Sequence, residues 1–393
     1  MVRVAQVVTR LIAGPGGVAL RGVLALDPER FAMTILEGEG GPLFAEAERA
    51  GLRVVRLRHM RPELSPLEDW RALAELRELL AEGSFELVHT HSAKAGAVGR
   101  LAAHQVGVAG VVHTLHGFPF HEFQSRLRRR AYIEAERRLG RITDQFLAVG
   151  SAVAAEAVRL RIAPPERIRS IASAIDTVGL EPASQATRKA ARLLLGLPLE
   201  ARVVGTVGRL DHQKAPQDLV AAARLLERPE VRFVWVGGGP LEHSLRRLVE
   251  RSGLSSRFLL LGERSDVKQL LPAFDVFAMA SHYEGLPCAL VEAICAGIPV
   301  VATAVNAVPE VVIPGRSGLL VPPAALALLS QALAYLLDHR EEAVRMAVAA
   351  RAVVGDRFRP SELGRDLTDV YWRALGRAPG LLAAPLAAVE PPS

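Results

Sequence analysis

The chain has few of the residues that hold small secreted or metal-bound domains together. Only two of its 393 residues are cysteine, Cys288 and Cys295. Two cysteines are too few for a disulfide framework, and these two lack the spacing of zinc ligands. We interpret both as small buried apolar residues in a reducing compartment. A disulfide-stapled secreted domain and a zinc finger are therefore excluded.

Long uninterrupted hydrophobic runs are also missing. Gln6, Thr9 and Arg10 interrupt the apolar N-terminal stretch, and no small-residue cleavage site follows it, so no secretory signal is expected. The most apolar window, Gly285 to Val305, contains Glu292 and two prolines, so no transmembrane helix is expected either. The sequence thus predicts a cytoplasmic protein.

Aromatic residues are scarce, at 5%, whereas basic residues are in excess. Lys and Arg number 48 against 42 Asp and Glu, which gives a net charge of +6 and favours anionic partners. No helix-turn-helix, zinc finger or aromatic RNA-binding motif accompanies this charge, so nucleic acid is not expected as a partner. Phosphorylated small molecules and lipid surfaces remain as the expected anionic partners.

Short apolar, β-branched runs alternate with longer helical patterns along the chain. Runs that are apolar throughout are typical of strands buried on both faces of a parallel sheet. The alternation predicts an α/β protein with two doubly wound, Rossmann-like domains. The expected strands are 4–8, 33–36, 54–57, 87–90, 111–115, 146–149 and 169–171 in the first half, then 203–207, 233–236, 258–261, 276–279, 300–303 and 318–321.

We place the first domain at residues 1–176 and the second at 177–357. A helix within 358–378 has one apolar stripe, and we expect it to pack back on the first domain. The tail, 379–393, is expected to be disordered because it is rich in proline and small residues.

The densest chemical signal follows the expected strand 276–279. Pro287 is suited to the first position of a helix that Gly297 and Pro299 would end, so a helix is predicted from about 287 to 296. Its N-terminus, preceded by Gly285, would offer free N–H groups to a diphosphate. Glu292 in the second turn could accept hydrogen bonds from a ribose, and Glu284 in the loop from a further sugar. A pair of surface glutamates flanking a helix is the plain alternative.

A second signal, Gly208-Arg-Leu-Asp-His-Gln-Lys214, directly follows the expected strand 203–207. Ligands of open α/β sheets bind beyond the carboxyl ends of the strands, so Arg209 and Lys214 could both meet a diphosphate there. A solvated basic loop is the alternative. The chain contains no Asp-x-Asp, so a metal-held diphosphate is not indicated. Basic side chains and a helix dipole could neutralise the leaving group instead.

Together these motifs resemble the donor domain of the family 4 retaining glycosyltransferases, which have the GT-B fold of two Rossmann-like domains facing each other across a cleft. The similarity rests on Glu284-x7-Glu292, on Gly208-Arg209-Leu-x3-Lys214, on Val308-Pro-Glu310 and on Gly318-Leu-Leu-Val-Pro-Pro323. Two segments of the first half, 89–96 and 113–121, are similar to the capsular and exopolysaccharide branch of that family. The resemblance covers nearly the whole chain.

The resemblance implies retaining transfer of a sugar from a nucleotide diphosphate sugar, UDP most of all, to an acceptor. That acceptor would be a saccharide, expected to be lipid-linked, in polysaccharide or envelope biosynthesis. The implied catalytic residues are His116, near the transferring sugar, and Glu284, on the donor sugar. A donor phosphate oxygen would take the acceptor proton, so a protein general base would not be obligatory. Neither a cofactor nor a metal is expected. The implied donor-binding residues are Gly16, Gly17, Gly208, Arg209, Lys214, Gly285, Leu286, Pro287 and Glu292.

The chain departs from the family pattern at three sites that often contain glycine. Ala215 follows Lys214 where the family often has glycine, Asn306-Ala307 stands for Gly-Gly, and Ser173-Ala174 replaces the interdomain Asn-Gly. We expect these loops to be stiffer, which bears on how far the domains close.

Other patterns carry weaker hypotheses. Gly14-Pro-Gly-Gly-Val-Ala19 matches a dinucleotide fingerprint and would suggest an NAD-dependent oxidoreductase, although Pro15 fits that turn poorly. The resemblance instead places Gly16 and Gly17 against the donor phosphate, and a flexible loop is the third possibility.

Four histidines, at 89, 91, 113 and 116, could suggest a metal site, but no carboxylate cluster is nearby and we expect no metal. Lys94 is a candidate for an acceptor phosphate or a solvated lysine.

The segment Phe123 to Arg141 is basic and partly apolar. Such a helix can bind an anionic membrane surface, which would place the protein peripherally on the inner membrane face, or it can simply be a solvated helix. Its arginines are Arg126, Arg128, Arg129, Arg130, Arg137, Arg138 and Arg141.

Two other functions remain open. A sugar-nucleotide epimerase of the same fold would convert the donor without an acceptor. A non-catalytic sugar-nucleotide-binding protein would bind the donor without turnover.

Overall fold

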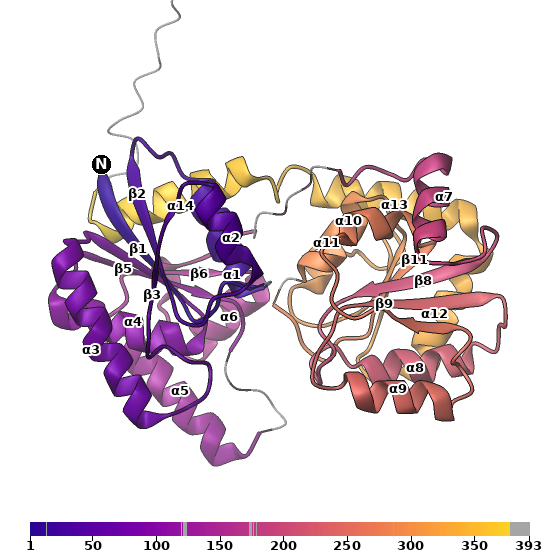
Figure 1. Cartoon of the computed structure of the whole chain (residues 1–393), viewed down its shortest axis with the longest axis horizontal. Helices are drawn as coiled ribbons and strands as arrows, with labels where there is room; N and C mark the ends of the chain where they lie inside the picture. The colour runs from indigo at the N-terminus through magenta and orange to yellow at the C-terminus, as the bar shows by residue number, and fades with distance from the viewer. Residues whose placement is uncertain are drawn as a thin grey trace, which may run out of the picture.

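The computed structural model describes residues 1–12, 14–118, 120, 124–172, 175, 177, 179–285 and 287–377. Two α/β lobes lie side by side (Figure 1). The N-terminal lobe contains a seven-stranded sheet in the order β3-β2-β1-β4-β5-β6-β7, and the C-terminal lobe a six-stranded sheet in the order β10-β9-β8-β11-β12-β13. All pairings between these strands are parallel, as predicted for two Rossmann-like domains of a GT-B protein.

All thirteen predicted strands are confirmed, each with its ends within two residues of the prediction. They are β1 (Val2–Val8), β2 (Phe31–Glu37), β3 (Arg53–Arg56), β4 (Leu87–His91), β5 (Gly110–Leu115), β6 (Gln145–Ala148), β7 (Ile168–Ser170), β8 (Arg202–Val207), β9 (Val231–Val236), β10 (Phe258–Leu260), β11 (Val276–Met279), β12 (Val300–Thr303) and β13 (Leu319–Val321). The central strands are buried on both faces, which is why their sequences read as continuous apolar runs.

Helices connect successive strands. They are α1 (Pro15–Leu24), α2 (Pro42–Arg49), α3 (Pro66–Gly83), α4 (Ala93–Val106), α5 (Arg126–Gly140), α6 (Ser151–Arg159), α7 (Gln185–Leu194), α8 (Pro216–Leu225), α9 (Glu242–Arg251), α10 (Val267–Leu270), α11 (Cys288–Cys295), α12 (Leu326–Asp338), α13 (Arg340–Val354) and α14 (Pro360–Ala374), with 3-10 turns at Pro165–Arg167, Leu271–Ala273 and Val308–Glu310.

Both sheets have the doubly wound strand order, so each has a point where the order reverses: between β1 and β4, and between β8 and β11. Ligands of such sheets bind outside the carboxyl ends of the strands at this point. Most of the candidate residues follow these four strands, and His116 follows the neighbouring strand β5.

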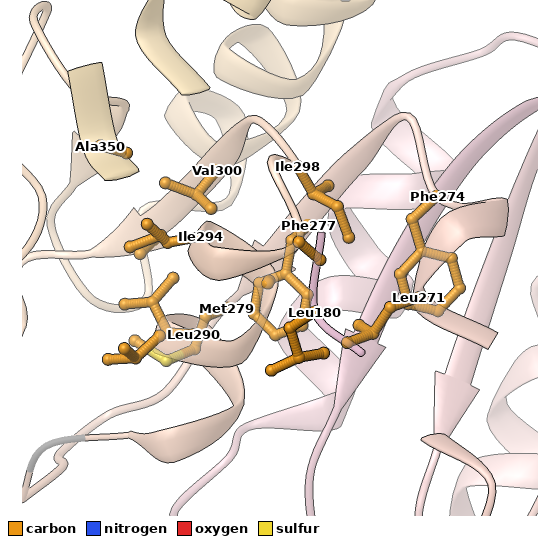
Figure 2. Close-up of a cluster of buried hydrophobic side chains, with 14 of the residues drawn as sticks. Leu180, Leu271, Phe274, Phe277, Met279, Leu290, Ile294, Ile298, Val300 and Ala350 are labelled. Carbon is orange, nitrogen blue, oxygen red and sulfur yellow. The ribbon is translucent and has the colours of Figure 1, made fainter. Parts of the chain in front are cut away.

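The core of the C-terminal lobe fixes α11 in place. Leu290 and Ile294 of this helix lie in a cluster with Phe277 and Met279 of β11 and Val300 of β12 (Figure 2). Pro287 precedes the helix as its N-cap, with φ −75° and ψ 108°, so the prediction that it is the first helical residue was wrong.

The chain crosses between the lobes twice. Ile175 and Phe358 both lie in the core of the C-terminal lobe, and the Ile175 N–H donates to the Phe358 carbonyl at 2.9 Å. Beyond Phe358, α14 returns to the N-terminal lobe, along which it runs in Figure 1. There Leu367 and Tyr371 are buried against Phe31 of β2, and the Tyr371 and Phe31 rings meet edge to face, 5.5 Å apart.

Several predictions fall on residues that the structure does not describe. Leu286, Phe123, the Ser173-Ala174 pair and the tail from residue 378 are among them. The boundary at 176/177 adjoins such residues too.

Candidate active site

Lys214 and Glu284 are brought together at the carboxyl ends of β8 and β11. The Lys214 Nζ lies 2.5 Å from Glu284 Oε1. Ser281 Oγ donates to the same oxygen at 2.6 Å, and Gln213 Nε2 donates to Oε2 at 3.2 Å. The Glu284 side chain is only 4% exposed, so the ion pair is largely shielded from water. The motifs predicted that both residues meet the donor, but not that they pair with each other.

Two residues that replace family glycines keep a glycine-like backbone. Ala215 has φ 47° and Asn306 has φ 44°, both in the left-handed region. Asn306 uses its amide as well, because its Oδ1 accepts from the Glu284 N–H at 2.8 Å. Asparagine tolerates this conformation, whereas alanine pays a steric penalty for it. The loops at Ala215 and Asn306 therefore keep a left-handed backbone conformation that glycine adopts readily.

The N-terminus of α11 lies where the two lobes touch. A side chain at Gly285 would place its Cβ 2.5 Å from the His116 carbonyl oxygen, so only glycine fits here. One turn into the helix, Glu292 is partly exposed while Leu290 and Ile294 point into the core. Gly285, Pro287 and Glu292 thus share one end of α11.

A network of neutral histidines fills the carboxyl ends of β4 and β5. Burial lowers the pKa of His89 and of His116 to about 3, and it holds the pKa of His91 and His113 well below their usual range. All four imidazoles are therefore uncharged at neutral pH.

A chain of hydrogen bonds from Gln6 through His91 determines which ring nitrogen of His116 carries the proton. Gln6 Nε2 donates to the Ala19 carbonyl at 3.4 Å, which fixes the amide orientation, and it lies 2.7 Å from His91 Nε2. His91 Nε2 must then accept, so His91 carries its proton on Nδ1 and donates it to His116 Nε2 at 2.9 Å. His116 is left with its proton on Nδ1. The Nδ1 of His116 is therefore a hydrogen-bond donor and cannot act as a base, because Nε2 already accepts from His91.

Tyr371 ties this network to α14. Its hydroxyl lies 2.8 Å from His89 Nδ1 and 3.4 Å from Gln6 Oε1. Sequence reasoning weighed His89 and His91 only as metal ligands and missed Gln6 and Tyr371. Within the described ranges, no group of three or more His, Cys, Asp or Glu side chains is arranged to hold a metal ion.

A pocket of about 720 Å³ joins predicted residues of both lobes. Gly16, Lys94 and Arg209 line it. The Arg209 side chain is 63% exposed, and its Nε lies 3.5 Å from Asp211. Lys94 already has protein partners, Asp69 at 2.6 Å and the Glu63 carbonyl. The prediction that Lys94 meets an acceptor phosphate stays a prediction.

Gly16 and Gly17, in the first turn of α1, pack tightly. A Cβ at Gly16 would lie 2.4 Å from the Arg10 carbonyl oxygen, and one at Gly17 would lie 3.1 Å from Arg21 Nη1. Gly208 follows β8, and a Cβ there would only touch the Lys214 side chain at 3.4 Å. Close approach therefore requires glycine at Gly16 more strictly than at Gly208.

Glu310 spans the two lobes. Its carboxylate accepts from the Ser151 N–H at 2.7 Å and from the Ala152 N–H at 3.3 Å, at the start of α6. Arg357 lies 3.3 Å from the other oxygen. A C-terminal residue therefore caps an N-terminal helix, and this contact holds the lobes together.

Comparison with known proteins identifies the class. Residues 18–178 match the profile described as Glycosyltransferase Family 4, and residues 188–353 match Glycosyl transferases group 1. The chain belongs to the family 4 glycosyltransferases with the GT-B fold.

Particular relatives differ in their reactions. The chain is 31% identical over 301 residues to the UDP-Gal:alpha-D-GlcNAc-diphosphoundecaprenol alpha-1,3-galactosyltransferase of Escherichia coli, covering 75% of this chain and 77% of that one. It is also 31% identical over 294 residues to a D-inositol 3-phosphate glycosyltransferase of Streptomyces scabiei, covering 69% and 64%.

Solved structures share the fold. Anabaena HepE, crystallised with UDP and glucose, superposes with a TM-score of 0.82 at 22% identity, covering 94% of this chain and 99% of HepE. Sucrose-phosphate synthase of Thermosynechococcus elongatus gives a TM-score of 0.79 at 21% identity, covering 96% and 100%. Among the residues that the structure describes, no helix combines the length and apolarity that a membrane crossing needs.

Proposed function

We propose that the protein is a retaining, metal-independent glycosyltransferase that moves a sugar from a UDP-sugar to a lipid-linked saccharide during polysaccharide or envelope biosynthesis. The observation that carries the proposal is the convergence of Lys214, Glu284 and the start of α11 with His116 of the other lobe. UDP is favoured because the Escherichia coli relative is named for UDP-Gal and HepE was crystallised with UDP. The lipid-linked acceptor is favoured by the name of that same relative.

The chemistry assigns a role to each group. Arg209 and Lys214 neutralise the diphosphate, Glu292 holds the ribose hydroxyls, and Glu284 accepts from hydroxyls of the donor sugar. Lys214 then exchanges part of its contact with Glu284 for a phosphate oxygen. His116, neutral and protonated on Nδ1, donates a hydrogen bond to the donor sugar.

The transfer step needs no protein side chain as a base. The bond between the anomeric carbon and the diphosphate oxygen breaks, and the acceptor oxygen bonds to the same carbon on the same face. The acceptor proton passes to the departing phosphate oxygen. Contact between the lobes at Gly285 and Glu310 excludes water, which limits hydrolysis of the donor.

Donor binding and turnover are tested separately. Glu292→Ala and Lys214→Ala should each weaken UDP binding in calorimetry at least about tenfold, since each removes a charge-assisted hydrogen bond. Glu263→Ala serves as the control variant, because this glutamate is not among the proposed ligands. Unchanged UDP affinity in both test variants would contradict the assignment.

Product analysis decides between the alternatives. A transferase releases UDP and forms a product with the same anomeric configuration only when acceptor is present. An epimerase converts the donor without acceptor, and a binding protein does neither. Activity that disappears on chelation and returns with a divalent cation would contradict metal independence.

A further inference from the structure

The pocket that joins the lobes continues away from the candidate site as an apolar groove over α4. Ala97 and Leu101 of α4 form its floor. Leu73 of α3 stands on one side, and Tyr132 and Leu139 of α5 on the other. Helices α3, α4 and α5 lie next to one another in this order in Figure 1.

The groove is built into the lobe. Lining residues recur along α4 at positions 93, 94, 97, 98 and 101, and along α5 at 132, 135, 136 and 139, so each helix presents one continuous stripe. Beneath the groove, Arg100 of α4 and Glu136 of α5 form a buried pair with Nη2 and Oε2 2.8 Å apart. The pair fixes the spacing of floor and wall.

The inner end of the groove reaches the candidate site. His91, which bonds to His116, lines this end together with Gly16 and Arg209. Arg10 lines it as well and pairs with Glu39 at the surface. Arg10 and Lys94 are the basic side chains of the N-terminal lobe that line the pocket, and they suit an anionic group located between the reacting sugar and the groove.

Three apolar residues that line the groove are exposed to solvent. Leu64 is 69% exposed, Trp70 67% and Leu101 38%. The wall helix α5 carries exposed Arg126, Arg128 and Arg130 near its start. A tryptophan and leucines beside a basic helix are the combination that meets an anionic lipid surface.

We propose that this groove holds the hydrocarbon chain of a prenyl-diphosphate-linked acceptor, with its diphosphate at Arg10 and Lys94 and its saccharide at His116. The inference rests on the proposed function and adds a subsite to it. A hydroxyl-rich sugar would lose its hydrogen bonds to water against these walls, whereas an isoprenoid chain gains from burial. The volume, about 720 Å³, is within the usual range for ligand pockets.

The test compares acceptors that differ only in chain length. A monosaccharide diphosphate carrying a short or a long prenyl chain is offered with UDP-sugar in one nonionic detergent, and kcat/KM is measured for each. The wild type should prefer the long chain. Ala97→Trp, which fills the floor of the groove, should lower the long-to-short ratio of kcat/KM by about tenfold, because each methylene excluded from burial forfeits affinity.

Val348→Trp is the matched control, since Val348 is 66% exposed on α13, in the other lobe. This variant should keep the wild-type ratio, and UDP should raise the melting temperature of both variants as it does that of the wild type. If the wild type shows no chain-length preference, or if Ala97→Trp keeps the preference, the groove proposal is wrong. If Ala97→Trp instead changes the mass seen in sedimentation, the groove is a contact between two copies and the proposal is also wrong.

Failure of the proposed function looks different. In that case the wild type transfers sugar to neither acceptor, whatever the chain length, although UDP still binds.

Discussion

Lys214 and Glu284 neutralise each other across two loops, with 2.5 Å between Nζ and Oε1. Both would be needed by the donor, one at the phosphates and one at the sugar. The pair holds the two loops in register and keeps a charge of each sign ready at the carboxyl ends of β8 and β11.

Lys214→Ala should lower stability as well as donor affinity. It leaves Glu284 in a site that is 4% exposed without its cation, which costs about 3 kcal/mol of unfolding free energy. Urea unfolding measures this loss. Adding Glu284→Gln should restore most of the stability but not the activity, and a double variant as unstable as Lys214→Ala would contradict the pairing.

Ala215→Gly should stabilise the protein by about 0.5–1 kcal/mol. Alanine at φ 47° carries a steric penalty that glycine lacks, and the greater freedom of glycine in the unfolded chain offsets only part of the gain. Ala221→Gly, inside helix α8, of which Ala215 is the N-cap, is the matched control and should destabilise by about 1 kcal/mol. Equal changes in unfolding free energy for the two substitutions would contradict backbone strain at Ala215.

Stability should fall with acid below about pH 6.5. The histidines have folded pKa values below their unfolded value of about 6.5, so the unfolded chain binds more protons in this range. Stability from these histidines is complete above pH 6.5 and declines as the pH falls toward 3, by at most about 1.4 kcal/mol per pH unit for each. Urea midpoints between pH 7 and 5 measure the decline, and His89→Asn should reduce its slope.

His91→Phe should lower kcat about a hundredfold by removing the group that fixes the proton of His116. Thr114→Val is the control, because it removes a partner of His89 and leaves the relay from Gln6 to His116 intact. The control should lose stability but keep kcat. A similar kcat in both variants would show that the relay has only a structural role.

Glu310→Gln should weaken the contact between the lobes. It removes a charge from the start of α6 and from Arg357, so the lobes should separate more often. Small-angle scattering should then give a larger radius of gyration without UDP than the wild type has. Ser151→Ala removes only the 3.2 Å hydroxyl contact and keeps both N–H bonds, so it should leave the radius unchanged.

Local patterns predicted the strands and the helix after Glu284, because these depend on neighbouring residues. The buried runs, and the Gly297-Ile298-Pro299 stop of α11, are all visible in the sequence. The start of α11 was off by one residue, because Pro287, although suited to the first helical position, precedes the helix as its N-cap.

The contacts within the site could not be predicted in the same way. The Gln6–His91 bond joins residues 85 positions apart, and the His89–Tyr371 bond joins residues 282 apart. Such pairs depend on how strands are ordered in the sheet and on where α14 returns. The groove is likewise hidden in the sequence, because Trp70 and Leu101 are simply apolar positions on two helices until those helices lie side by side.

The return of α14 has a consequence for how the protein is made. Phe31, near the start of the chain, is covered by Tyr371, near its end. During synthesis the first lobe emerges early, yet it lacks the helix that closes its core until the ribosome has finished the second. A nascent chain stalled before Pro360 would expose that face, so the core of the first lobe closes only after the whole second lobe has been synthesised.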